Sequence, residues 1–146
     1  MNEWPWEGAV QQVFVDVLTA EGWVIERAAN TATREHGVDV KAVKGARRLG
    51  AEVKGYPSPG YRNANKPGQK RSSTIKNQAL TAYARALLAA LKLRDAEPDR
   101  ESLVVLPEHP QYQQLFENTR QSLGSAQVHV VLLGPDGTVT CPTWRP

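Results

Sequence analysis

Residues 37–54 read GVDVKAVKGARRLGAEVK, two runs of alternating side chains on either side of Gly45-Ala46. Alternation with a period of two is typical of a strand that buries one face, and a glycine beside a small residue suits a tight reversal. We therefore predict strands over 38–43 and 49–54 that pair as an antiparallel hairpin. The strands are joined either by a tight turn centred between Gly45 and Ala46 or by a longer loop. With the tight turn, residues equally far from that centre lie opposite each other.

This register places Asp39 opposite Glu52. Directly opposed residues of an antiparallel pair have Cβ atoms about 4.5–5.5 Å apart, so the two carboxylates can share one hard cation. Without a cation, two negative charges at this separation repel each other. Side chains two residues apart on a strand share a face, so Lys54 projects beside Glu52, about 7 Å along the strand.

These residue types suit metal-assisted hydrolysis of a phosphodiester. Mg²⁺ prefers oxygen ligands and keeps several waters, and a divalent ion both activates a water and stabilises negative charge developing on a phosphate. Lys54 could orient or deprotonate that water, or neutralise the transition state.

Upstream of the hairpin, apolar residues recur at helical spacing from Glu7 to Leu18, and residues 23–28 read as a strand. Residues at i, i+4, i+7 and i+11 stack on a helix, so Glu7 lies at the leading end of the stripe that continues through Gln11 and Phe14. Glu7 is therefore either part of an inward-facing site or simply a favourable charge on the helix dipole.

Downstream, breakers and polar residues over 55–73 predict a long loop, followed by an amphipathic helix beginning at Ile75. A buried strand, a helix, a second apolar strand and a turn are predicted at 103–106, 110–123, 128–133 and 135–137. The expected fold class is α/β: one domain over 1–146, with a mixed central sheet flanked by helices in the order αβββαβαβ.

The acid on the first helix, the aspartate on the second strand and the Glu-x-Lys on the third together resemble the PD-(D/E)xK nuclease superfamily. The resemblance covers roughly residues 5–107 and is carried by Gly37–Val40 and Ala51–Tyr56. The superfamily includes Holliday-junction resolvases and Mrr-like enzymes. The proline that many members carry before the aspartate is replaced here by Val38.

The resemblance implies a restriction-endonuclease-like fold and a metal-dependent DNA endonuclease of the restriction, repair or junction-resolving type. It implies that Asp39 and Glu52 bind Mg²⁺ or Mn²⁺, with the Val53 carbonyl and Glu7 as further ligands, and that Lys54 is catalytic. The pattern alone leaves open DNA against RNA, and cleavage against binding by a non-cleaving module of a defence or repair complex.

Basic residues are concentrated in the middle of the chain. The net charge is only +3, yet residues 53–94 hold nine of the 18 lysines and arginines and no acid. Such a block favours a polyanion, because each neutralised phosphate releases counterions. The bases placed nearest the expected site, and predicted to bind nucleic acid, are Arg62, Lys66, Lys70, Arg71 and Lys76.

Other features narrow the class of protein. No apolar run approaches the roughly 18 residues of a membrane span, and the N-terminus lacks a signal-peptide pattern, so we expect a cytoplasmic protein without a membrane partner. A single cysteine, Cys141, excludes an internal disulfide framework. The small size favours a homodimer or a place in a larger complex.

Overall fold

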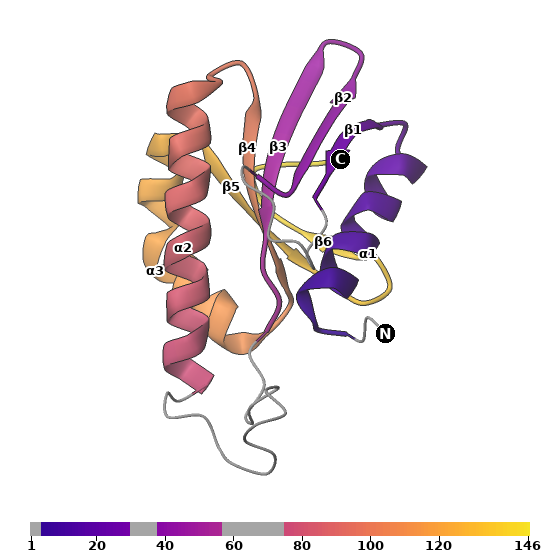
Figure 1. Ribbon diagram of the computed structural model, residues 1–146. Coiled ribbons are helices and arrows are strands. Elements are labelled where there is room, and N and C mark those ends of the chain that lie inside the picture. Colours follow the sequence, from indigo (N-terminus) through magenta and orange to yellow (C-terminus); the bar gives the residue numbers. More distant parts are fainter. Residues whose placement is uncertain (1–3, 30–37, 57–74) are drawn as a thin grey trace.

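The computed structural model describes residues 4–29, 38–56 and 75–146 of the chain (Figure 1). Its elements in chain order are α1 (Glu7–Ala20), β1 (Val24–Ala28), β2 (Val40–Lys44), β3 (Arg47–Val53), α2 (Ile75–Ala96), β4 (Glu101–Pro107), α3 (Pro110–Ala126), β5 (Val128–Leu133) and β6 (Val139–Thr140). The first eight follow the predicted order, and β6 is an addition.

The strands form one six-stranded mixed sheet in the order β1-β2-β3-β4-β5-β6. The first three strands are antiparallel, β3, β4 and β5 are parallel to one another, and β6 returns antiparallel to β5. The parallel strands are joined by the helices α2 and α3, as parallel connections require. The sheet therefore consists of an antiparallel meander followed by two βα crossovers.

The predicted register of the β2–β3 hairpin is confirmed. Val40 pairs with Ala51 and Lys44 with Arg47, so the turn consists of Gly45 and Ala46 alone. Gly45 has φ +60°, the positive value that the first central residue of a type II′ hairpin turn requires.

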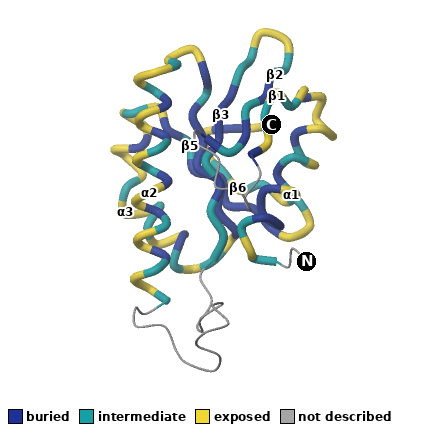
Figure 2. Tube along the Cα trace, in the orientation of Figure 1, coloured by how far each residue is buried: buried dark blue, intermediate teal, exposed yellow. Residues whose placement is uncertain are grey.

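Helices cover both faces of the sheet, which gives three layers (Figure 1). α1 packs Val10, Phe14 and Leu18 onto one face, and α2 and α3 pack on the other through Tyr83 and Tyr112 among other residues. The strands separate these two cores. β4 and β5 are buried almost throughout, whereas β1 alternates between exposed and half-buried residues and the outer faces of the helices are exposed (Figure 2). On β4 the alternation is explicit, because Leu103 and Val105 belong to the α1 core and Val104 and Leu106 to the other.

Several boundaries differ from the prediction. β2 begins at Val40, so Asp39 immediately precedes it, and β3 spans Arg47–Val53 instead of 49–54, so Lys54 immediately follows it. The predicted elements over 103–106 and 110–123 are longer in the structure, where they are Glu101–Pro107 and Pro110–Ala126. The two-residue strand β6 is too short to show a period in sequence. None of the helices in the described chain has the length and apolar content needed to cross a membrane.

Candidate active site

Glu52 lies on the face of the sheet that α2 covers. Its neighbours Ala51 and Val53 belong to the α1 core, so the residue between them points the other way. Gly50, two residues earlier, lies directly under Leu93 of α2, since a Cβ at Gly50 would come within 2.5 Å of the Leu93 side chain. Glu52 therefore projects into the space between β3 and α2.

Asp39 is fixed next to this carboxylate by a backbone contact. Its Oδ2 accepts a hydrogen bond from the Val53 N–H at 2.7 Å, one step beyond the last pair of the β2–β3 ladder. The Asp39 carbonyl in turn accepts a hydrogen bond from the Ala29 N–H at 2.7 Å, directly after β1. The hydrogen bond from the Val53 N–H keeps the Asp39 side chain at the same strand end as Glu52 and Lys54.

Lys54 completes the group at the end of β3. Its Nζ lies 3.6 Å from Glu52 Oε2, and its side chain is about a quarter exposed. The Lys54 N–H donates to the Val105 carbonyl on β4, which continues the parallel ladder one residue past β3. Two further hydrogen bonds hold the chain beyond it: Tyr56 N–H donates to the Pro5 carbonyl, and the Tyr112 hydroxyl donates to the Gly55 carbonyl at 2.8 Å.

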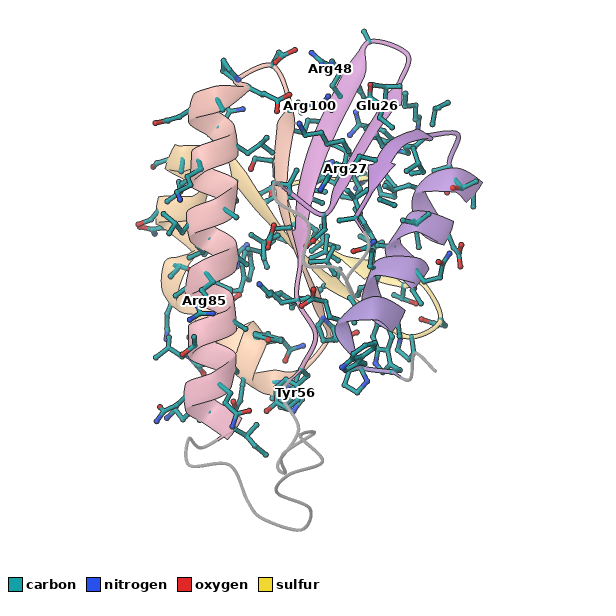
Figure 3. The ribbon with its side chains drawn as sticks, in the orientation of Figure 1. Glu26, Arg27, Arg48, Tyr56, Arg85 and Arg100 are labelled. Carbon is teal, nitrogen blue, oxygen red and sulfur yellow. The ribbon has the colours of Figure 1, made fainter. Side chains whose placement is uncertain are left out.

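Gly55 brings the start of α1 against the end of β3, near Tyr56 in Figure 3. A Cβ at this position would lie 2.6 Å from the Glu7 nitrogen and 2.7 Å from the Pro5 oxygen, so only glycine fits without moving backbone. This close approach places Glu7, the first residue of α1, near the group formed by Asp39 and Lys54.

The three acids influence each other electrostatically. Burial and then the Asp39 charge raise the pKa of Glu52 to about 7 from 4.5, although Lys54 acts in the opposite direction. Burial also raises the pKa of Asp39, partly offset by the Val53 N–H, Lys54 and Arg27. Burial raises the pKa of Glu7 as well, with Lys54 lowering it and Asp39 raising it.

This donor set fits a divalent cation held by a pair of carboxylates. Mg²⁺ commonly takes only one or two protein carboxylates and completes its shell with water. A cation between Asp39 and Glu52 would remove the repulsion that contributes to the raised pKa of Glu52. Within residues 4–29, 38–56 and 75–146, no group of three or more Asp, Glu, His or Cys side chains is arranged to hold a metal, so Glu7 as a third ligand stays a prediction.

The structure describes one of the five residues predicted to contact nucleic acid. Lys76 is exposed in the first turn of α2, whereas Arg62, Lys66, Lys70 and Arg71 lie outside the described residues.

Sequence reasoning missed three other cations. Lys41 of β2 and Arg85 and Lys92 of α2 line a groove that also contains Glu52. The acid-free block from 53 to 94 included Arg85 and Lys92, but only the packing of α2 on the sheet shows that they face the site.

Comparisons with known proteins support the fold. No family model and no curated protein matches the chain. The structure is similar to the crystal structure of an XisH family protein from Nostoc punctiforme, with a TM-score of 0.50 and 20% sequence identity over 90% of this chain and 96% of that one. At this identity, the similarity shows a shared α/β fold.

Proposed function

We propose that this chain is a metal-dependent DNA endonuclease with a restriction-endonuclease-like fold. The observation that carries the proposal is the grouping of Asp39, Glu52 and Lys54 at one end of β3, with a salt-bridge distance of 3.6 Å and a carboxylate whose pKa is near 7. Strongly perturbed acids that face a groove are typical of functional sites.

Asp39 and Glu52 would hold Mg²⁺ or Mn²⁺, with the Val53 carbonyl and Glu7 as proposed further oxygen donors. When bound there, such an ion supplies an activated water and stabilises negative charge on the phosphate. The hydrogen bond from the Val53 N–H fixes the orientation of the Asp39 carboxylate. The hydrogen bond from the Lys54 N–H to the Val105 carbonyl holds the Lys54 backbone against β4, in the same extended segment as Glu52.

Lys54 contributes a positive charge next to the reacting phosphate. Its ammonium, placed beside Glu52, can donate hydrogen bonds to phosphate oxygens as their charge increases in the transition state. It can also orient the attacking water. Neither role requires Lys54 to bind the metal.

The competing function is a nuclease-fold protein that binds nucleic acid without cutting it. The presence of both carboxylates and the lysine in one cluster favours catalysis, because a binding module has no need to bury two repelling acids. Cleavage therefore separates the two functions directly.

The test is to incubate the protein with linear, nicked, single-stranded and four-way-junction DNA in Mg²⁺, Mn²⁺ or EDTA. We expect fragments in either metal and none in EDTA. Lys54→Met should lower the rate about 10²–10³-fold with little change in Mn²⁺ affinity, whereas Lys44→Met, near the far end of β2, should do neither. Binding without cleavage in both metals would favour the non-cleaving module.

A further inference from the structure

A groove of about 410 Å³ separates α2 from the sheet beside the proposed site. Val38, Lys41 and Glu52 line it from the sheet, and Arg85, Leu88 and Lys92 line it from α2. Because Glu52 is one of its walls, a ligand in this groove lies against that carboxylate.

The α2 wall carries positive charge that the described residues do not neutralise. Arg85 and Lys92 are seven residues apart and so share a face of the helix, about 10 Å apart along its axis. Neither forms an ion pair with any other residue of the described chain. The acid at the other end of the groove, Glu97, is already paired with Lys41 and Arg100, each at 2.7 Å.

Between these two cations the wall is apolar. Leu88 is 54% exposed although it is a large aliphatic residue on a charged helix. Two cations on either side of an exposed apolar side chain can contact both the phosphates and a base face of an unpaired nucleotide strand. A duplex hides its base faces in the stack, and a groove of 410 Å³ is in the size range of a single small ligand.

We propose that this groove binds one unpaired strand, with phosphates on Arg85 and Lys92 and a base against Leu88. The proposal rests on the proposed nuclease function and names its substrate as single-stranded or locally unpaired DNA. The strand would then pass Glu52 with a phosphate within reach of the site.

The test measures binding alone, by fluorescence anisotropy of a labelled 12-nucleotide single strand in EDTA, with the same sequence as duplex DNA and as single-stranded RNA. The single strand should bind at least tenfold more tightly than the duplex. Arg85→Gln and Lys92→Gln should each weaken it about fivefold at 0.1 M salt and reduce the slope of log affinity against log salt by about 0.7. Arg120→Gln, on the exposed face of α3, is the charge-matched control and should change neither.

A second pair of variants tests the proposed contact between Leu88 and a base. Leu88→Ala should weaken single-strand binding about fivefold without changing the salt slope. Leu80→Ala is the control, because Leu80 lies on the same helix, is 51% exposed and does not line the groove.

Several results would overturn the assignment of the groove: duplex binding as tight as single-strand binding, unchanged slopes for Arg85→Gln and Lys92→Gln, or equal losses for Leu88→Ala and Leu80→Ala. Tighter binding of single-stranded RNA would support an unpaired strand as the occupant and would show that the groove prefers RNA to DNA. Since no metal is present, failure of the groove is distinguishable from failure of the nuclease function, which only the cleavage assay tests.

Discussion

Burial, a neighbouring carboxylate and a neighbouring cation act together on the pKa of Glu52. Its side chain is 14% exposed, it shares a sheet face with Asp39, and its nearest cation is Lys54. A pKa near 7 means that the folded protein holds a proton there which the unfolded chain releases at an ordinary pKa of 4.5. Without metal, this carboxyl therefore lowers the free energy of unfolding as pH rises from about 4.5 to 7.

Metal affinity should change with pH in the opposite direction to this contribution to stability. Below pH 7 a cation must displace the Glu52 proton, so log Mn²⁺ affinity should rise by about one per pH unit up to about pH 7 and then level off. Calorimetry in buffers of different ionisation enthalpy would also count about one proton released at pH 6. Glu52→Gln should bind Mn²⁺ weakly and with no such rise; a wild-type affinity independent of pH between 5 and 7 would contradict the assigned pKa.

At this scale the sequence predicts the partners but not their contacts. Strand parity and a two-residue turn are enough to bring Asp39, Glu52 and Lys54 together. The hydrogen bond from Val53 to Asp39 and the contact of Gly55 with the start of α1 depend on where two elements meet, and no local pattern encodes that.

At the scale of elements, the segment after β3 is held by contacts from three other parts of the chain. β4 accepts from Lys54, the turn before α1 accepts from Tyr56, and α3 donates through the buried Tyr112. Lys54 is thus positioned by tertiary contacts and by its own strand. The geometry of the site should be sensitive to changes in α3, which contributes no proposed catalytic group.

Tyr112→Phe tests this dependence. Loss of the hydroxyl leaves the Gly55 carbonyl without this donor, and we expect a roughly tenfold slower single-turnover cleavage. Tyr83→Phe is the matched control, because Tyr83 is also buried between α2 and α3 and its hydroxyl bonds Thr119 at 2.7 Å, away from the site. Both variants should lose about 1 kcal/mol of stability. Equal cleavage rates for the two would show that Tyr112 is only structural.

Long periodic elements were predictable and their junctions were not. β5 matches its predicted bounds because a short apolar run between a helix and a Pro-Asp-Gly turn predicts a buried strand with clear ends. The groove beside Glu52 could not be foreseen, because its walls come from β2, β3 and α2, and only their packing defines it.

At the scale of the whole molecule, Arg100 ties the sheet to the end of α2, far from Tyr56 (Figure 3). Its side chain is 5% exposed and donates to Glu26 on β1, to the Leu49 carbonyl on β3 and to Glu97. Lys41 of β2 bonds the same Glu97, so the two cations together connect β1, β2 and β3 to the segment that follows α2. Removing Arg100 would leave the buried Leu49 carbonyl without this donor, whereas Glu26 and Glu97 are partly exposed and can bond water.

Arg100→Leu should therefore lower the free energy of unfolding by about 2 kcal/mol. Arg48→Leu provides the comparison, since Arg48 pairs with Asp99 at the surface and both side chains are exposed. That change should cost less than about 1 kcal/mol. Urea unfolding of the two variants side by side measures the difference; similar losses would mean that the Arg100 contacts add no more than a surface pair.

We propose above that Asp39, Glu52 and Lys54 form a metal-dependent active site. Its most direct test is the Mg²⁺-dependent cleavage rate of labelled DNA by wild type and by Asp39→Asn, purified in parallel so that a contaminating nuclease would appear in both. Asparagine can still accept the Val53 N–H, so the fold is kept while the charge is lost. We predict fragments from wild type and a rate at least about a hundredfold lower from the variant. Equal rates from the two proteins would contradict the claim.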